Sequence, residues 1–301
     1  MADRDTLRQI QALTQSGDVT QAANLAEEAL TSGLEHPFVL NLVAVKREHE
    51  GRPEAAVDLL RRALEIAPDD IGCRHALGIL LNSLETPREA LEHFDAVIAA
   101  HPDFAPAHAC RGAALEALGV LDAAAEAYRR ALELQAGNLI ALAGLASLHS
   151  RRGEHKDARQ FAGQVLRVEP NFPNAVMSLA AADIALGAAE KAETLLRDLL
   201  ADPRPTRLEK ALARGALADA LDAQGRFREA FDAYASANEE RRVIYASRFA
   251  HGRSTLELAQ AMQSYFQRTS RGSWRRSMAE AAAPSGTRGH VFLIGFPRSG
   301  T

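Results

Sequence analysis

The sequence predicts an all-α fold, in which short helices form pairs and the pairs repeat along most of the chain. Aromatic residues make up only 5% of the 301 residues, and an interior built mainly from Ala and Leu suits close-packed helices better than a β-sandwich. The sequence also repeats at intervals of 34 residues, with units that start at Asp3, Pro37, Ile71, Ala105, Leu139 and Pro173. Repeats of this length are typical of stacked helix-turn-helix units.

Alanine at the twentieth position marks the register of every unit. A seventh unit starts near Ala211, after four extra residues at 207–210. The two helices of a unit cross closely at the twentieth position, where a larger side chain would hold the backbones apart. All seven units carry the small residue: Ala22, Ala56, Ala90, Ala124, Ala158, Ala192 and Ala230.

Glycine at the fifteenth position ends the first helix of each unit. It supplies the left-handed backbone conformation that helix ends favour, and the third unit alone has Glu85 there in place of glycine. Proline closes several units, at Pro68, Pro102 and Pro170, because a helix cannot continue through it. The glycines are Gly17, Gly51, Gly119, Gly153, Gly187 and Gly225.

Large apolar residues of the second helices are expected to fill the space against the next unit. Each contributes on the order of 1.5–3 kcal/mol when buried. They include Leu60, Phe94, Tyr128, Leu196 and Tyr234.

Over residues 3–244, this spacing and residue set resemble the tetratricopeptide repeat family. The resemblance implies a right-handed α-solenoid, whose concave face is lined by first helices at their second, fifth, ninth and twelfth positions. Receptors of this family that hold an acidic C-terminus use Lys, Asn and Arg there, and no such clamp is found, which favours a scaffold or dimerising surface over a peptide groove. The implied positions include Phe38, Asn41, Val45, His75, Ile79, Asn82, Pro106, Ala109, Ala113, Ile140, Ala143, Ser147, Met177, Ala181, Gly215 and Asp219.

Three further segments follow the repeats. Residues 245–268 are expected to form a helical segment that caps the last unit, and residues 269–289 read as a linker rich in turn residues. The linker region carries a locally basic patch beside Trp274, which is interpreted as solvated chain rather than as a cofactor contact. The patch consists of Arg268, Arg271, Arg275, Arg276 and Arg288. Residues 290–301 are predicted to be a β-strand and loop that begin an α/β domain.

Charge and composition exclude several classes of protein. The formal net charge of -4 provides no basic field for nucleic acid or anionic lipid. The charged N-terminal residues lead into no apolar stretch, so a secretory signal is not expected, and no apolar run reaches the roughly 18 residues of a membrane span. The expectation is a cytoplasmic protein whose concave face binds a protein or peptide partner, with a homodimer as an alternative.

No metal or catalytic site is predicted within the repeats. Cys73 and Cys110 lie outside any metal-ligand spacing and are expected to be buried packing residues. The ten histidines are scattered, and carboxylates such as Glu239 and Glu240 belong to charged helix faces.

The last residues match a phosphate-binding pattern. An apolar run, 290–294, precedes Gly295-Phe296-Pro297-Arg298-Ser299-Gly300-Thr301. The two glycines have the spacing of a Walker A loop, GxxxxGK[ST], but Thr301 stands where that loop has its lysine, which disfavours an ordinary P-loop hydrolase.

This segment resembles the 5′-phosphosulfate loop of sulfotransferases that use 3′-phosphoadenosine 5′-phosphosulfate. The resemblance implies that Arg298 contacts the phosphosulfate bridge and neutralises charge on the leaving phosphate. Ser299, Gly300 and Thr301 would donate hydrogen bonds to the 5′-phosphate. Proteins in which tetratricopeptide arrays precede this loop form a group of sulfotransferases.

Two hypotheses therefore stand, together with a weaker third. The first is the N-terminal, truncated part of a sulfotransferase that transfers a sulfuryl group to a hydroxyl or amine acceptor; a strand and half a loop cannot bury the nucleotide, so this chain by itself is expected to be inactive. The second is a non-enzymatic scaffold for protein-protein interaction. The third is a divergent nucleotide hydrolase.

Overall fold

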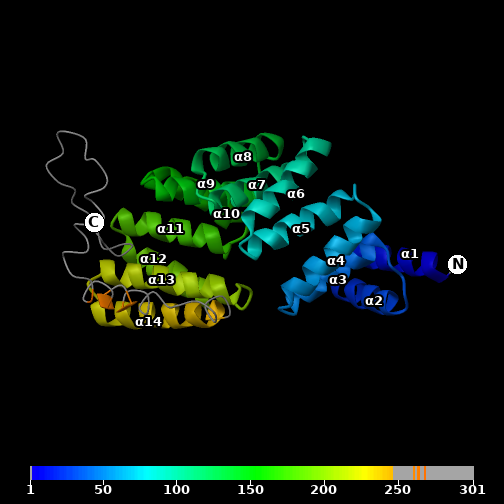
Figure 1. Cartoon of the computed structure of the whole chain (residues 1–301). Helices are drawn as coiled ribbons and strands as arrows, with labels where there is room; N and C mark the ends of the chain where they lie inside the picture. Colours follow the sequence, from blue (N-terminus) through cyan, green and yellow to red (C-terminus); the bar gives the residue numbers. More distant parts are fainter. Residues whose placement is uncertain (1, 247–259, 262, 265–267, 269–301) are drawn as a thin grey trace, which may run out of the picture. The chain divides into compact units, whose positions relative to one another are not determined.

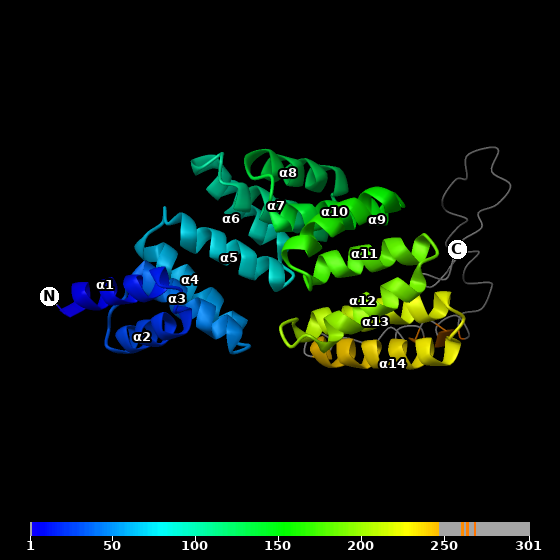
Figure 2. The ribbon, with the colours of Figure 1, turned by 180° about the vertical axis from the view of Figure 1, so that it is seen from behind.

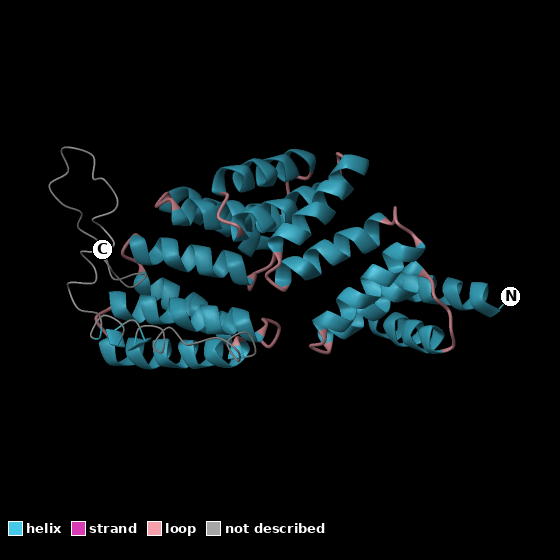
Figure 3. Cartoon of the chain, in the orientation of Figure 1, coloured by secondary structure: helices cyan, strands magenta, loops and turns pink. Residues whose placement is uncertain are grey.

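The computed structural model describes residues 2–246, 260, 261, 263, 264 and 268. It divides the chain into two units, Met1–Arg241 and Arg242–Thr301. The described part is all-helical and contains no strand (Figure 3). Its helices are α1 (Ala2–Gln15), α2 (Val19–Thr31), α3 (Pro37–His49), α4 (Pro53–Ile66), α5 (Ile71–Ser83), α6 (Pro87–Ala100), α7 (Ala105–Ala117), α8 (Leu121–Leu134), α9 (Leu139–Arg151), α10 (His155–Val168), α11 (Pro173–Ala185), α12 (Ala189–Ala201), α13 (Arg207–Ala223) and α14 (Phe227–Ile244).

The helices alternate between two layers of a solenoid. Odd-numbered helices are the first helices of the repeats and even-numbered helices the second, and the two of a repeat pack together, as α3 does with α4 and α7 with α8 (Figure 1). Each first helix from α3 to α11 also contacts the first helix of the next repeat. The view from behind shows the same order (Figure 2). The first helices from α3 to α13 therefore form one continuous layer.

Local chemistry explains where the helices begin. Asp70 and Asn138 each accept a hydrogen bond from the backbone N–H three residues on, at 2.8 and 3.0 Å. Thr206 and Glu209 form a reciprocal capping box at the start of α13. Proline occupies one of the first two positions of α3, α4, α6, α7 and α11, where its missing N–H costs no helical hydrogen bond.

Both repeat markers have the predicted roles. The alanine of the twentieth position is buried in all seven units. The six glycines of the fifteenth position have φ between 72° and 84°. Glu85 has φ 58° and is the one residue other than glycine with positive φ in the described chain. The third unit thus keeps the turn without the residue that favours it.

The seventh repeat differs in length from the others. The four extra residues, 207–210, form the first turn of α13, which has 17 residues where the earlier first helices from α3 to α11 have 13.

The large apolar residues of the second helices are buried with one exception. Leu60, Phe94, Tyr128 and Leu196 are buried as expected, but Tyr234 of α14 is 37% exposed. Tyr234 lies on α14, the last helix of the array that the structure describes, and its hydroxyl donates to Asp219.

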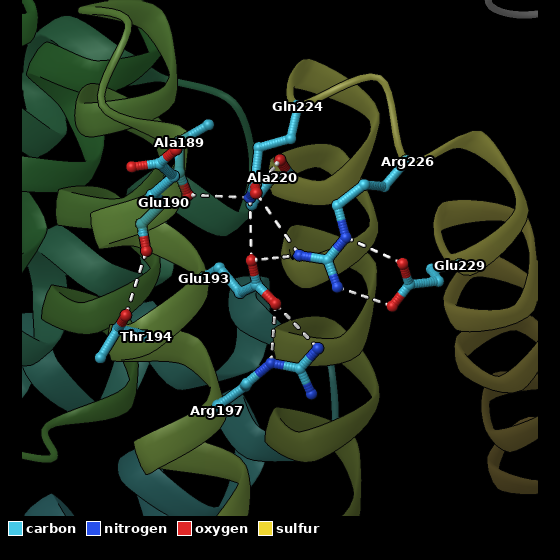
Figure 4. Close-up of polar contacts among 9 residues, drawn as sticks. All are labelled: Ala189, Glu190, Glu193, Thr194, Arg197, Ala220, Gln224, Arg226 and Glu229. Atoms are coloured by element: carbon cyan, nitrogen blue, oxygen red, sulfur yellow. Dashed lines mark hydrogen bonds and ion pairs between the residues drawn. The ribbon is translucent and has the colours of Figure 1, made fainter.

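A polar network joins the three helices at the C-terminal end of the array (Figure 4). Glu193 of α12 accepts hydrogen bonds from Gln224, at 3.0 Å, and from Arg226, at 2.7 Å, both in the turn between α13 and α14. Arg197 reaches the same carboxylate at 2.8 Å. The hydrogen bond from Gln224, with those from the two guanidinium groups, lowers the pKa of Glu193 to about 2.

The predicted strand and loop at 290–301 and the linker at 269–289 lie outside the described residues. So does most of the predicted capping segment at 245–268. The assignment of those segments stays a prediction.

Candidate functional site

A groove of about 520 Å³ crosses the layer of first helices in the middle of the array. Four consecutive first helices, α5, α7, α9 and α11, contribute its lining, together with one residue of α8 and the residue that precedes α11. The lining residues are Asn82, Ala113, Glu116, Ala117, Tyr128, Ile140, Ala143, Gly144, Ser147, Arg151, Phe172, Asn174, Met177 and Ser178. The groove therefore belongs to four repeats rather than to any one of them.

Two glycines determine where the ring of Tyr128 lies in the floor of the groove. A Cβ atom on Gly144 of α9 would lie 2.1 Å from the ring, and one on Gly112 of α7 would lie 2.6 Å from it. Real Cβ atoms do not approach other atoms so closely, so both positions require glycine. The Tyr128 ring, which projects from α8, consequently lies between α7 and α9, and its hydroxyl reaches the groove.

Glu116 of α7 is the centre of a polar cluster at this point. The Tyr128 hydroxyl donates to one carboxylate oxygen at 2.9 Å, and the Ser147 hydroxyl donates to the other at 2.6 Å. Arg151 is more distant, with Nη1 at 3.8 Å from Oε1. Burial, and then the neighbouring Glu116 carboxylate, raise the pKa of Tyr128, so its hydroxyl keeps its proton and remains a donor.

The charge of the groove is concentrated in this cluster. Glu116 and Arg151 are the only charged residues that line it. The side chain of Glu116 is 18% exposed and that of Arg151 is 50% exposed, so the carboxylate lies in the floor and the guanidinium at the rim.

Neutral polar groups and apolar side chains complete the lining. The Oδ1 atom of Asn82 is buried and has no hydrogen-bond partner among the described residues, and Asn174 lies at the α11 side of the groove. Ile140 is exposed, as is Ala117, so the wall offers apolar contact as well as hydrogen bonds.

The structure brings together part of the predicted concave face. Asn82, Ala113, Ile140, Ala143, Ser147 and Met177 all line the groove. Ala109 is instead fully buried, because α7 packs closely against its neighbours. Val45 lines a separate hollow of about 320 Å³ beside α2. His75 lies between the rings of Phe94 and Phe104, with centroids at 5.8 and 5.2 Å.

The repeat positions that predict the concave face also include two groove residues that the prediction left out. Glu116 occupies the twelfth position of the fourth unit, as Asn82 does in the third unit. Asn174 occupies the second position of the sixth unit, as Ile140 does in the fifth unit. Tyr128 and Gly144 carry no such signal, because they reach the groove only through the way that three helices pack.

The cysteines have the predicted packing role, and one group of ligand-type residues is present. Burial raises the pKa of both Cys73 and Cys110 to about 12, so neither is a reactive thiolate. His149, Glu154 and Asp157 have ligand-type atoms within 4.8 Å of one another. Glu154 and Asp157 are exposed and His149 contacts Glu154 directly, so an ordinary hydrogen bond at the surface accounts for the arrangement.

The predicted phosphate contacts, Arg298, Ser299, Gly300 and Thr301, lie outside the described residues. No helix among the described residues is long and apolar enough to cross a membrane.

Sequence models of the tetratricopeptide repeat match the chain in three places. One matches residues 49–114 and 150–215, and a second matches residues 7–71. None of these matches concerns a sulfotransferase. A search of curated proteins finds no match to this chain.

Solved structures with the same fold are similar to this chain at low identity. A tetratricopeptide repeat protein from Parabacteroides merdae is 16% identical, with a TM-score of 0.58 over 79% of this chain and 93% of that one. PilW, a type IV pilus biogenesis factor, is 22% identical, with a TM-score of 0.55 over 70% and 98%. A chain of the APC/C hetero-tetramer Cut9-Hcn1 is 16% identical, with a TM-score of 0.62 over 74% and 43%. At such identities the likeness shows the fold alone.

Proposed function

Because the chain belongs to the tetratricopeptide repeat family, we propose that it is a protein-binding scaffold whose groove receives an extended segment of a partner protein. The observation that carries this proposal is the groove itself, which crosses four first helices and has Ala, Gly or Ser at six of its fourteen lining positions. Small side chains leave room for the main chain of a ligand to approach the helices.

The dimensions favour an extended segment over a compact ligand. Packed helices lie about 8–10 Å apart, so four first helices span roughly 25–30 Å. An extended chain advances about 3.3–3.6 Å per residue, and a segment of about seven to nine residues therefore crosses all four. The buried Oδ1 of Asn82 and the amide of Asn174 are suited to hydrogen bonds with such a main chain.

Selection of peptides from a displayed random library by the full chain tests this function. Ala117→Trp and Ile140→Lys each alter an exposed groove position, and both are expected to weaken the selected peptides at least tenfold. Val168→Lys is the matched control, because Val168 is 70% exposed and lies on α10, outside the groove. Peptides that bind all three variants equally would contradict binding in the groove.

A second copy of the chain is the alternative occupant of the concave face. Light scattering over a range of protein concentrations tests it: a dimer that Ile140→Lys dissociates and Val168→Lys leaves intact would support self-association. A mass that remains that of one chain would leave another protein as the partner.

A second candidate function rests on the last seven residues. The apolar run at 290–294 and the following Gly295-Phe296-Pro297-Arg298-Ser299-Gly300-Thr301 support a proposal that the complete protein is a sulfotransferase, with 3′-phosphoadenosine 5′-phosphosulfate as donor. The repeats would then recruit a substrate or partner protein. Cytoplasmic location suits both functions, since two free cysteines persist in a reducing compartment.

Titration of 3′-phosphoadenosine 5′-phosphate into the complete protein tests the sulfotransferase. Saturable binding in the micromolar range, lost in Arg298→Ala, would support it. Arg271→Ala is a control for general attraction of the anion by the basic patch. If no nucleotide binds, the scaffold stands alone.

A further inference from the structure

We propose, building on the scaffold function on which this inference rests, that the groove recognises a basic side chain of its partner. Glu116 would receive the ammonium of a Lys or the guanidinium of an Arg, carried by the extended segment that crosses the four repeats.

The hydrogen-bonding capacity of Glu116 is only partly used. A carboxylate has about four acceptor sites, and the hydroxyls of Tyr128 and Ser147 occupy one on each oxygen. Arg151 lies 3.8 Å from the nearer oxygen, beyond hydrogen-bond distance. The remaining sites are available to a ligand in the groove.

Glu116 has only a loose ion pair to balance its charge. Tyr128 and Ser147 are neutral donors, and Arg151, the only cation in the lining, pairs with Glu116 at 3.8 Å from a half-exposed position at the rim. A carboxylate that has lost much of its water gains free energy from a close cation, so a partner's Lys or Arg would supply what the groove lacks.

The carboxylate is also held in place before any partner binds. The Tyr128 ring is 2% exposed and lies directly against α7 at Gly112 and against α9 at Gly144. Its hydroxyl and that of Ser147 therefore orient Glu116 from two helices. A pre-oriented group loses little conformational freedom when a ligand arrives, which favours affinity.

The same geometry disfavours an acidic partner. A partner carboxylate that approached Arg151 would come close to Glu116, since these two residues are themselves only 3.8 Å apart. Like charges at such a distance repel and cost binding free energy. A partner cation would also approach Arg151, but Arg151 is half-exposed and therefore more strongly screened by water than Glu116, which is 18% exposed. The less exposed carboxylate thus favours a positive over a negative side chain.

The decisive experiment applies the displayed random library to the full chain and then to Glu116→Gln. Among peptides that Ala117→Trp weakens, Lys or Arg should be enriched at one position, and binding should fall at least tenfold in Glu116→Gln. Glutamine keeps an oxygen that can accept from one of the two hydroxyls and presents an NH2 group to the other, so the variant removes the charge with little change in shape. Glu126→Gln, at an exposed site on α8, is the matched control. Arg151→Gln should leave affinity unchanged or raise it.

The outcomes separate this inference from the function on which it rests. Groove-dependent peptides enriched in Asp or Glu, or weakened by Arg151→Gln and not by Glu116→Gln, would overturn the basic-partner inference and keep the scaffold. A selection in which no peptide depends on the groove would overturn both. Thermal unfolding of each variant establishes that the effects come from binding rather than from loss of the fold.

Discussion

Glu85 illustrates how a repeat can impose a conformation on a residue that disfavours it. Its φ of 58° places it in the left-handed region that the six glycines of the same position occupy. That region costs a residue with a Cβ atom about 1–2 kcal/mol. The neighbouring helices α5 and α6 pack against each other, and their packing holds the turn in spite of this cost.

Exchanging the residues of this position therefore has opposite effects in two units. Glu85→Gly relieves the backbone strain, and part of this gain is lost because glycine has greater conformational freedom in the unfolded chain. We therefore expect the variant to raise the free energy of unfolding by about 0.5–1 kcal/mol. Gly119→Glu is the reverse exchange at a position where an added Cβ would meet nothing within 4 Å, and it should lower stability by a similar amount. Urea unfolding of both variants measures this; a stabilising Gly119→Glu would contradict it.

His75 makes part of the stability depend on pH. Burial lowers the pKa of its imidazole below the usual 6.5, and its Nε2 atom is buried without a hydrogen-bond partner in the described chain. The folded state therefore favours the neutral ring, whereas the unfolded state takes up a proton near pH 6.5. The contribution is complete above that pH and is lost as the pH falls.

We expect the free energy of unfolding to decrease less steeply between pH 7 and pH 5 in His75→Leu than in the unchanged protein. One proton accounts for a slope of at most about 1.4 kcal/mol per pH unit. His93 also has a pKa lowered by burial, so a smaller slope should remain until His93→Leu is added. Urea unfolding at a series of pH values measures the slopes, and an unchanged slope in both variants would rule out this origin.

At the scale of helices, small apolar residues join the helices of each pair. At the C-terminal end of the array, a polar network also restrains the orientation of the helices. Glu193 gathers donors from its own helix and from the turn between α13 and α14 (Figure 4). Such a network restrains the angle between three helices more than apolar contact does, because hydrogen bonds depend on direction.

Removing the charge of Glu193 should weaken this connection in a pH-dependent way. We expect Glu193→Gln to lower the free energy of unfolding by about 1 kcal/mol at neutral pH. Because folding lowers the pKa of this carboxyl to about 2, its contribution is present above the ordinary pKa near 4.5 and is lost as the pH falls toward 2. The difference between the two proteins should therefore vanish there. Glu190→Gln, in the exposed first turn of α12 and outside the network, should change the free energy of unfolding by at most about 0.5 kcal/mol.

For the molecule as a whole, each repeat contacts mainly its neighbours. The helix contacts run from each helix to the next between α1 and α13, and from each first helix to the next first helix between α3 and α13. In such an array, stability is close to a sum of repeat and interface contributions. The interface between the fourth and fifth units contains Tyr128, which lies in the floor of the groove.

Disturbing this interface should affect both stability and binding. We expect Gly144→Ala to cost about 1–3 kcal/mol, because its methyl group would overlap the Tyr128 ring, and to broaden or split the unfolding transition. Gly163→Ala is the control in the interior of α10, where a Cβ meets nothing within 4 Å; it should stabilise by up to about 1 kcal/mol. Calorimetry of the two variants measures both effects, and equal effects would contradict the role of the ring.

The sequence by itself determined the helices, their pairing and their register, because these depend on short-range properties. Proline starts helices, glycine ends them, and alanine marks the close crossing, each for a reason that acts within one 34-residue unit. Only the tertiary structure decided which residues of the concave face meet and what they can bind. Tyr128, Gly144 and Glu116 come from three helices, so their distances follow from packing across two repeats, which no local pattern encodes.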